Sequence, residues 1–369
     1  MKAKRGQPLV LLAAGGTGGH LFPAQALAVA LGKRGVSVAL ATDRRAAHYD
    51  FPAESVHVIP SATMRGRNPV ALAKTFGSLG YGTLKAWLMI GKLAPDAAVG
   101  FGGYPTVPPL YAATLRGVPT VLHEQNSVMG RANRFLAPRV TAIATGFAEV
   151  AKMKPAWQTK ATFTGNPIRP AVIAAAGKPF TGPGASGMFR LVVFGGSQGA
   201  QIMSQVVPAA VARLDSTLRA RLSVVQQARP EDADAVRDAY DKLGVIAEVA
   251  TFFNDLPARM AQAHLIISRS GASTVAEVAA IGRPAIFVPL PHALDQDQLA
   301  NAGVLQKAGG AIRINQPDFT PERLSAEVAA LAETPERLSR MAEASRTAGT
   351  VDAAERLADL VLRIASIRR

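Results

Sequence analysis

The chain has 369 residues, of which 49% are hydrophobic and 18% are charged, and it contains no cysteine. The absence of cysteine excludes disulfides, thiolate metal sites and cysteine nucleophiles, and the composition gives no sign of secretion. A basic start precedes an apolar run too short for a signal peptide, and no run approaches the ~18 apolar residues of a membrane span. We therefore expect a cytoplasmic protein whose membrane contact, if it has one, is peripheral.

The net charge of +15 lies almost entirely in the first half of the chain. Residues 1–168 contain 19 Lys and Arg against 6 Asp and Glu, a net charge of +13. Residues 169–369 contain 22 against 20, a net charge of +2. This asymmetry indicates an anionic partner for the first half, either nucleic acid, anionic lipid or an anionic substrate.

Strand-like and helix-like segments alternate along the chain. In the first half, short apolar runs predict strands at residues 9–14, 36–41, 56–59, 97–101, 120–122 and 141–144. The pattern restarts in the second half, with strands predicted at residues 190–194, 222–226, 247–250, 264–268 and 285–288. Because such alternation is typical of doubly wound parallel sheets, we predict an α/β fold with two Rossmann-like domains that face a cleft.

The domain boundaries follow from composition. Residues 178–187 are rich in Gly, Pro and Ser, which is typical of a linker. We predict an N-terminal domain at residues 1–168, a linker at 169–188 and a C-terminal domain at 189–345. The last segment, residues 346–369, is expected to form a helix that packs back on the N-terminal domain.

Two glycine-rich turns share one plan: an apolar strand, Gly-Gly, a hydroxyl residue, one further residue and Gly. They are LVLLAAGGTGGH and FRLVVFGGSQGA, so that Gly15 corresponds to Gly195. Glycines let a ligand approach the backbone, and the following helix offers N–H groups and a positive dipole end. A tight strand-to-helix turn without a ligand is the simpler interpretation of either copy. Neither copy matches GxGxxG or the P-loop, which disfavours NAD enzymes and P-loop NTPases.

Polar motifs follow several other predicted strands, at the edge where open α/β sheets bind ligands. Glu277 lies just after the start of a predicted helix that begins near SGAST. Its carboxylate could accept from two vicinal ribose hydroxyls, or it could form a capping box with Thr274. The further motifs are GFGGYP, HEQNS, TGNPIRP and PHALDQDQLANAG.

Seven motifs occur in one order over about residues 10–305: GGTGGH, GGY, HEQN, GNPIR, GGSQGA, SRSGAST with Glu277, and PHALDQDQLANAG. In this set the chain resembles the bacterial peptidoglycan glycosyltransferases that convert lipid I to lipid II. The resemblance implies a GT-B fold and inverting transfer of N-acetylglucosamine from UDP-GlcNAc. The implied acceptor is the 4-hydroxyl of the muramyl sugar of undecaprenyl-pyrophosphoryl-MurNAc-pentapeptide (lipid I). The implied place is the cytoplasmic face of the inner cell membrane, in the cell-wall synthesis on which cell shape and division depend.

The resemblance also assigns residues, with the donor in the second domain and the lipid acceptor in the first. The donor-binding residues that it implies are Thr17, Gly18, Gly19, Asn126, Arg169, Gly196, Ser197, Gln198, Gly199, Phe253, Ala272, Ser273, Thr274, Glu277, Gln296 and Gln298. The acceptor-binding residues that it implies are Gly15, Gly16, Tyr104, His123 and Asn126. An anionic phospholipid surface and other cell-wall synthesis proteins are further expected partners, and nucleic acid is not.

Inverting transfer needs a base for the attacking hydroxyl. Only the first glycine turn ends in a histidine, His20, where the second has Ala200. An imidazole near its unperturbed pKa of ~6.5 can accept a proton at neutral pH, so His20 is the candidate general base. Two alternatives stay open: His20 could cap the turn or bind the acceptor diphosphate, and Glu124 is a rival base.

We expect neither a metal nor a cofactor, because a helix N-terminus and backbone amides can stabilise a leaving diphosphate. Two Asp-x-Asp triplets are the alternatives as metal ligands. The first, residues 232–234, lies in a stretch typical of a solvated helix face, and the second, residues 295–297, overlaps the expected sugar site.

Residues 68–92 predict a helix with an apolar side and a basic side. An ordinary crossover helix is one interpretation, and three glycines weaken a straight helix. The other interpretation is a membrane patch, in which apolar side chains enter the bilayer and basic side chains meet anionic lipid. The residues of this patch are Lys74, Phe76, Leu79, Lys85, Trp87 and Leu88.

Two other functions are compatible with parts of the sequence. A UDP-GlcNAc 2-epimerase can have the same fold, but it leaves the basic, apolar first half unexplained. A nucleic-acid binder explains the charge, but the basic residues are not interleaved with aromatic residues and no recognition motif occurs.

Overall fold

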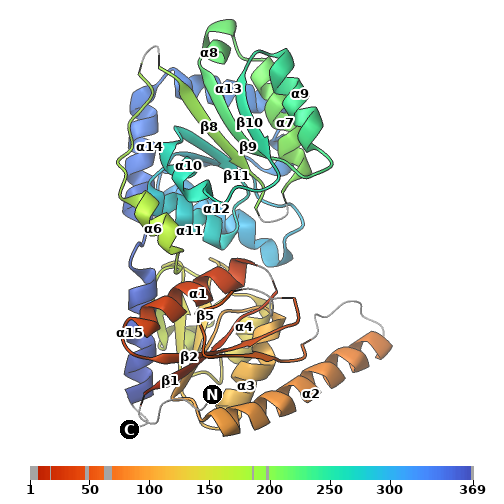
Figure 1. Cartoon of the computed structure of the whole chain (residues 1–369), viewed down its shortest axis with the longest axis vertical. Coiled ribbons are helices and arrows are strands. Elements are labelled where there is room, and N and C mark those ends of the chain that lie inside the picture. The colour runs from red at the N-terminus through yellow and green to blue at the C-terminus, as the bar shows by residue number, and fades with distance from the viewer. Residues whose placement is uncertain are drawn as a thin grey trace. The chain divides into compact units, whose positions relative to one another are not determined.

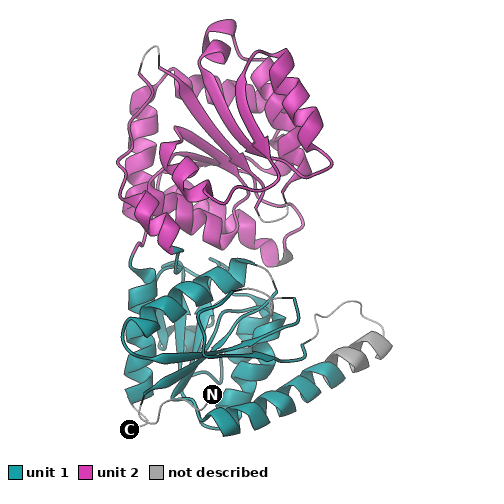
Figure 2. Ribbon diagram, viewed as in Figure 1, with its two compact units in different colours: residues 1–169, 352–369 teal, residues 170–351 magenta. Residues whose placement is uncertain are grey.

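The structure, a computed structural model, describes residues 7–16, 18–45, 50–61, 69–184, 187–196 and 199–366, without the side chains of residues 69–76 and Leu294. The chain divides into two compact units (Figure 2). Unit 1 comprises residues 1–169 and 352–369, and unit 2 comprises residues 170–351.

Unit 1 is built on a seven-stranded parallel sheet with the strand order β3-β2-β1-β4-β5-β6-β7. Its strands are β1 (Leu9–Ala13), β2 (Ser37–Thr42), β3 (Ser55–Val58), β4 (Ala97–Gly100), β5 (Thr120–Glu124), β6 (Ala142–Thr145) and β7 (Ala161–Phe163). Its helices are α1 (Gly18–Gly32), α2 (Pro69–Leu93), the 3-10 turn η1 (Tyr104–Thr106), α3 (Val107–Leu115), α4 (Arg131–Leu136), α5 (Pro155–Gln158) and α15 (Ala353–Ser366).

The five inner strands of unit 1 (β1, β2, β4, β5 and β6) are buried on both faces, which explains their nearly continuous apolar sequences. In β1, Val10 and Leu12 belong to the core under α1 and α15, whereas Leu9 and Leu11 belong to the core under α2, α3 and α4. This alternation is the two-residue period of a strand. Helix α15 lies beside α1 (Figure 1), so the end of the chain completes the core of unit 1.

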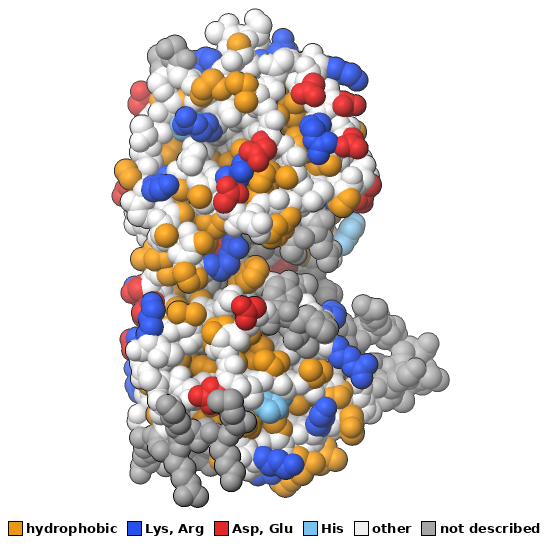
Figure 3. Space-filling model, in the orientation of Figure 1, with side chains coloured by type: hydrophobic (Ala, Val, Ile, Leu, Met, Phe, Trp, Pro, Cys, Tyr) orange, Lys and Arg blue, Asp and Glu red, His pale blue; other side chains and the backbone are white. Residues whose placement is uncertain are grey.

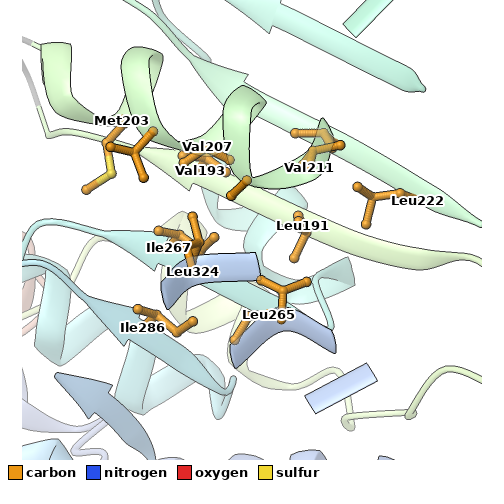
Figure 4. Packing of buried hydrophobic residues seen from close by; sticks show 14 of the residues in the cluster. Leu191, Val193, Met203, Val207, Val211, Leu222, Leu265, Ile267, Ile286 and Leu324 are labelled. Carbon is orange, nitrogen blue, oxygen red and sulfur yellow. The ribbon is translucent and has the colours of Figure 1, made fainter. Parts of the chain in front are cut away.

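Unit 2 has a six-stranded parallel sheet with the order β10-β9-β8-β11-β12-β13. Its strands are β8 (Phe189–Phe194), β9 (Leu222–Gln227), β10 (Ile246–Ala250), β11 (Leu265–Ser268), β12 (Ala285–Phe287) and β13 (Ala311–Arg313). Its α-helices are α6 (Pro170–Ala176), α7 (Gln201–Ala212), α8 (Ser216–Ala220), α9 (Ala233–Lys242), α10 (Leu256–Gln262), α11 (Ala272–Ile281), α12 (Asp297–Lys307), α13 (Pro321–Ala332) and α14 (Pro335–Ala348). Its 3-10 turns are η2 (Leu294–Gln296) and η3 (Gln316–Asp318). Figure 4 shows Met203, Val207 and Val211 of α7 packed on side chains of the sheet.

The α/β class and the two parallel sheets confirm the predicted fold class. Each of the eleven predicted strands is present to within a few residues, and the two that were not predicted, β7 and β13, are three-residue edge strands. In both sheets the chain order reverses beside the first strand, between β1 and β4 and between β8 and β11. Ligands of open α/β sheets bind at this switch point, outside the carboxyl ends of the strands.

The segment expected as a linker, residues 169–188, contains α6, which packs against α10 and α11 of unit 2. The following residues are held by two arginines. Buried Arg283 donates to the carbonyls of Lys178 (3.2 Å) and Pro179 (3.3 Å), and Arg346 donates to that of Ala176 (3.0 Å). These carbonyls accept hydrogen bonds from guanidinium N–H groups that would otherwise be buried without a partner. This segment is therefore part of the fold of unit 2.

Candidate functional site

The first glycine turn connects β1 to α1 and is fixed by an acidic side chain from the end of β2. Gly16 has φ +88°, which favours glycine, and its N–H donates to Asp43 Oδ1 over 3.3 Å. Arg45 donates to the other oxygen of Asp43 through Nε (2.9 Å) and Nη2 (2.6 Å). A Cβ on Gly15 would lie 2.9 Å from Pro105 Cβ, so the turn is closely packed. Thr17 lies outside the described residues.

His20 lies in the first turn of α1, half-buried, and its imidazole is oriented by the turn after β4. Its Nδ1 lies 2.9 Å from the carbonyl oxygen of Phe101. Because a carbonyl only accepts, Nδ1 carries the proton and Nε2 carries the lone pair. A Cβ on Gly103 would lie 3.3 Å from Nε2, and Gly103 has φ +74°, so the backbone can approach the ring here only because it is glycine.

Burial lowers the pKa of His20 below its ordinary value of 6.5, and the hydrogen bond to Phe101 opposes this shift without cancelling it. The imidazole is therefore neutral at pH 7. A neutral imidazole with its lone pair at Nε2 can accept a proton, which is what a general base requires.

The carboxylate of Glu124, at the end of β5, is fully engaged inside the fold. It is 1% exposed. One oxygen accepts from the Asn126 N–H (2.9 Å) and the other from the Gly130 N–H (2.9 Å) and Asn133 Nδ2 (2.7 Å). Burial raises its pKa, and these donors oppose the shift. Glu124 thus ties the loop after β5 to the start of α4.

His123, the residue before it, is also enclosed. Its side chain is 0% exposed, and its Nε2 lies 3.1 Å from the carbonyl oxygen of Gly165. Burial lowers its pKa to about 4. The ring lies against that of Phe101, with the centroids 5.6 Å apart. Since no part of this side chain reaches the surface of unit 1, its contribution is to hold the GNP segment against β5.

His264 of unit 2 is a second buried histidine whose pKa burial lowers to about 4. Its Nδ1 accepts from the Arg190 N–H over 3.0 Å. Both His123 and His264 are neutral in the folded protein, whereas in the unfolded chain they take up protons near pH 6.5. The contribution of these two histidines to the stability of the fold is therefore fully present above pH 6.5 and is lost as the pH falls from 6.5 towards 4.

We expect the free energy of unfolding to fall over this interval by roughly 3 kcal/mol for each histidine. Urea unfolding at a series of pH values measures it. His264→Asn keeps an acceptor for Arg190, and His123→Gln keeps a donor for Gly165, so each variant should remove about half of the decrease. An unfolding free energy that is constant from pH 6.5 to pH 4 would contradict these pKa values.

Four other polar residues lie at the same edge of unit 1. Asn166 is buried, and its Nδ2 donates to the Gln125 carbonyl over 2.9 Å. Asn126 is half-buried beside Glu124, and half-buried Arg169 places its guanidinium 4.9 Å from the ring centre of Phe22. Half-buried Tyr104 begins η1, directly after the glycines of the GGY motif, and Gly18 and Gly19 begin α1.

In unit 2 the glycine turn between β8 and α7 repeats the plan with a neutral partner. Gly196 has φ +91° and Gly199 has φ +70°. The N–H of Gly195 donates to Gln227 Oε1 over 3.2 Å, from the end of β9, where unit 1 uses Asp43. An amide in this place lets an anion approach the turn without charge repulsion. Ser197 and Gln198 lie outside the described residues.

Helix α11 begins at Ala272, with Gly271 as its N-cap residue. Thr274 is therefore inside the helix, so the capping-box interpretation of Thr274 and Glu277 is wrong. Ser273 and Thr274 are half-buried in the first turn, and Glu277 follows one turn later with 7% exposure.

The start of α12 is bonded to the turn before α11. Gln298 Oε1 accepts from the N–H groups of Leu290 (3.0 Å) and Ser270 (3.4 Å). Asp295 and Gln296 have φ of +60° and +55°, a conformation that is costly for residues other than glycine. Burial raises the pKa of Asp297. Within the described ranges, no three His, Asp or Glu side chains gather into a group that could hold a metal ion.

Phe253 lies in the loop between β10 and α10. Its side chain is 9% exposed, and the guanidinium of Arg259 lies 4.5 Å from the ring centre. Arg259 also pairs with Glu248 and Asp255. The ring is therefore held in place.

Helix α2 exposes a mixed apolar and basic surface. The exposed fractions are 62% for Tyr81, 56% for Leu84, 52% for Leu88 and 39% for Trp87. Lys85 lies among them, also exposed. Hydrophobic and basic side chains lie together along the lower edge of unit 1 in Figure 3. The opposite face of α2, with Ala86 and Ile90, is buried in the core of unit 1, so α2 is a crossover helix between β3 and β4 that also has this exposed face. Leu79 is half-buried, and the side chains of Lys74 and Phe76 lie outside the description.

No helix among the described residues combines the length and the hydropathy that a membrane span requires. The exposed face of α2 continues onto the end of α3, where Leu115 is 58% exposed. Between them, the guanidinium of Arg116 lies 3.7 Å from the ring centre of Trp87.

Most of the site residues at the carboxyl ends of the strands could be predicted from the sequence in both units. Three residues that hold these site residues in place could not. Asp43 directly follows β2 and Gln227 is the last residue of β9, and each fixes a glycine turn, but a lone polar residue at the end of a strand carries no distinctive pattern. Gln125 lies within the HEQN motif, but the motif does not indicate that its amide lies beside His20.

Comparison with known proteins matches both units to one glycosyltransferase family. The Glycosyltransferase family 28 N-terminal domain matches residues 10–145, and the Glycosyltransferase family 28 C-terminal domain matches residues 190–357. A curated relative from Rhodopseudomonas palustris (strain BisB18) is 60% identical over 362 residues, 98% of this chain and 96% of its own length. Its name is UDP-N-acetylglucosamine--N-acetylmuramyl-(pentapeptide) pyrophosphoryl-undecaprenol N-acetylglucosamine transferase.

Two solved structures have the same fold. MurG of Acinetobacter baumannii superposes with a TM-score of 0.78 at 28% identity, over 96% of this chain and 99% of its own. A UDP-GlcNAc 2-epimerase from Neisseria meningitidis, solved with UDP-GlcNAc bound, gives a TM-score of 0.66 at 14% identity, over 96% of this chain and 100% of its own. At 14% identity, the similarity to the epimerase concerns the fold alone.

Proposed function

The chain belongs to the family of the UDP-N-acetylglucosamine–N-acetylmuramyl-(pentapeptide) pyrophosphoryl-undecaprenol N-acetylglucosamine transferases, and from this membership we propose how its residues carry out the reaction. The protein is a hexosyltransferase that transfers N-acetylglucosamine from UDP-GlcNAc to lipid I and forms lipid II in peptidoglycan synthesis. We propose that the 4-hydroxyl of the muramyl sugar is the attacking group, that the configuration at the anomeric carbon inverts, and that individual residues have the roles given below.

We assign the donor to unit 2. The glycine turn at Gly196 and Gly199 leads into the N-terminus of α7, whose backbone N–H groups bind the diphosphate. Glu277 accepts from the ribose hydroxyls, while Ser273, Thr274 and Gln298 lie along the nucleotide and sugar. The neutral Gln227 supports this assignment, because a carboxylate in its place would repel the diphosphate. As UDP leaves, these dipoles stabilise the charge that develops on its terminal phosphate.

We assign the acceptor to unit 1, with His20 as the general base. The observation that carries this assignment is the neutral imidazole, whose proton is on Nδ1 and whose lone pair is on Nε2, at the switch point of the sheet. Nε2 removes the proton of the 4-hydroxyl while its oxygen attacks the anomeric carbon from the face opposite UDP. The bond to UDP breaks, and the configuration at that carbon inverts. Glu124 and His123 serve as buried supports rather than as a base or an acceptor contact.

The rate of UDP release from UDP-GlcNAc, measured with and without a lipid I analogue, tests this function against the epimerase alternative. A transferase releases UDP at a rate that rises with acceptor concentration. Formation of the manno epimer of UDP-GlcNAc without acceptor would favour the epimerase instead. The epimerase from Neisseria meningitidis shares only the fold with this chain, at 14% identity, and so does not favour that alternative.

We further propose that unit 1 binds the cytoplasmic face of the inner membrane through α2, which delivers the enzyme to its lipid acceptor. Leu84, Trp87 and Leu88 enter the headgroup region, while Lys85 and Arg116 meet anionic lipid. The excess positive charge of residues 1–168 supports the same orientation. We also propose that other cell-wall synthesis proteins are partners of the enzyme at this location.

Binding to vesicles that contain anionic lipid is expected to be salt-sensitive. Each basic residue near such a surface contributes ~1 kcal/mol, so reversing both Lys74 and Lys85 to Glu should weaken binding by roughly 30-fold or more. Lys307→Glu, an exposed position in unit 2, is the control and should have little effect. Sedimentation with vesicles measures the binding. Equal binding to neutral vesicles at high salt would contradict the electrostatic contribution.

A further inference from the structure

Gln125 has no part in the mechanism so far, although it lies directly beside the imidazole of His20. Its side-chain nitrogen is 2.8 Å from the carbonyl oxygen of Phe101 and 3.1 Å from His20 Nδ1. Gln125 is 4% exposed, and its own carbonyl accepts from Asn166 Nδ2. The residue is thus held from two directions inside unit 1.

The orientation of the amide follows from its partner. If the oxygen of the Gln125 amide faced the Phe101 carbonyl, two acceptors would be in contact at 2.8 Å. The nitrogen therefore faces the carbonyl and donates to it. Phe101 O then receives two donors, from Gln125 and from His20 Nδ1, one for each of its lone pairs.

The three atoms form a nearly equilateral triangle, with sides of 2.8, 2.9 and 3.1 Å. The two N–H bonds of an amide diverge by about twice the angle at a corner of such a triangle. When one N–H points to Phe101 O, the other cannot point to Nδ1. Since Phe101 O only accepts and lies 2.9 Å from His20 Nδ1, the triangle is satisfied only when Nδ1 carries a proton and donates it to this carbonyl.

We propose, on the premise that His20 is the general base, that Gln125 is its positioning residue. The Gln125 amide holds the Phe101 carbonyl in place, so that His20 keeps its proton on Nδ1 and presents Nε2 as the basic atom. The base is thus prepared before the acceptor arrives. Without the amide, the carbonyl loses a fixed partner, and the ring can exchange tautomers or rotate.

The other charged and titratable groups around His20 are engaged with other partners, so Gln125 is the residue that positions it. His123 is neutral, with a pKa of about 4, and its Nε2 bonds to Gly165. The oxygens of Glu124 face Asn126, Gly130 and Asn133. At the turn before α1, the carboxylate of Asp43 is paired with Arg45.

The test uses two variants of the full chain. Gln125→Met keeps the length of the side chain and removes the donor, and Gln125→Glu places a carboxylate beside the ring. Nitrogen-15 NMR of the histidines, without substrates, reports the tautomer and the pKa of His20, and His20→Gln identifies its signals. The second readout is the pH profile of kcat, with thermal unfolding to show that each variant folds.

In the unmodified protein we expect one tautomer, protonated at Nδ1. Gln125→Met should populate both tautomers and lower kcat by roughly tenfold, with the KM for UDP-GlcNAc unchanged. Gln125→Glu should raise the pKa of His20 by about 1–3 units and move the acidic limb of the kcat profile by the same amount.

An unchanged tautomer in Gln125→Met together with an unchanged His20 pKa in Gln125→Glu would overturn the proposal. If the tautomer and the pKa move while the kcat profile does not, Gln125 positions His20, but His20 is not the base. That outcome separates a failure of the proposed function from a failure of this inference. A lower kcat without any change at His20 would assign Gln125 a purely structural role and would also overturn the proposal.

Discussion

Replacing His20 with alanine is expected to lower kcat by about 10²–10⁴-fold, which corresponds to about 3–5 kcal/mol of barrier. The variant removes the Nε2 lone pair, and the attacking hydroxyl then loses its proton to water. UDP-GlcNAc binding should stay nearly unchanged, because the donor contacts that we propose lie mainly in unit 2. Steady-state kinetics with a lipid I analogue and calorimetry with UDP-GlcNAc measure the two effects.

His57→Ala provides a matched control, since His57 is a histidine of unit 1 on β3, outside the proposed site. It should retain full turnover. If His20→Ala turns over normally at saturating acceptor and only the acceptor KM rises, His20 binds the acceptor and is not the base. Glu124 would then have to be reconsidered as the base, despite its engagement with Asn126, Gly130 and Asn133.

Replacing Glu277 with glutamine is expected to weaken UDP and UDP-GlcNAc binding by roughly 1.5–3 kcal/mol, the strength of hydrogen bonds to a charged group. This corresponds to a Kd about 10–150-fold higher. The change is nearly isosteric, but it replaces one acceptor oxygen with a donor, which cannot accept from the second ribose hydroxyl. Calorimetric titration with UDP measures the loss.

Glu343→Gln, at an exposed position on α14 in unit 2, makes the same chemical change away from the site and should bind UDP normally. Thermal unfolding of both variants should resemble that of the unmodified protein, because Thr274 lies inside α11 and Glu277 does not cap it. A marked loss of stability with an unchanged UDP affinity would assign Glu277 a structural role.

The central strands of both sheets could be predicted because they are buried on both faces and therefore have continuous apolar sequences. The edge strands β7 and β13 could not. Residues 161–163 (ATF) are largely exposed, and residues 311–313 (AIR) end in arginine, so neither run is long or apolar enough to stand out. Their strand conformation depends on pairing with β6 and β12, which is a tertiary effect.

The site divides in the same way. The glycine turns, His20 and the motifs after β5 and β11 could be identified, because each combines a characteristic set of residues with the end of a strand. Their neighbours could not, since Asp43 reaches the glycine turn across 27 positions and Gln125 meets His20 across 105. The tautomer of His20 likewise depends on the Phe101 carbonyl, 81 positions away. These contacts exist only once the sheet has formed.

The structure of the product tests the central claim most directly. The protein is incubated with UDP-GlcNAc and a lipid I analogue, and the linkage in the isolated glycolipid is determined by NMR. Because the donor has the α configuration, inverting transfer to the 4-hydroxyl predicts a β-1,4 bond between N-acetylglucosamine and the muramyl sugar. An α-linked product, a bond to a different hydroxyl, or UDP released with no disaccharide formed would contradict the account.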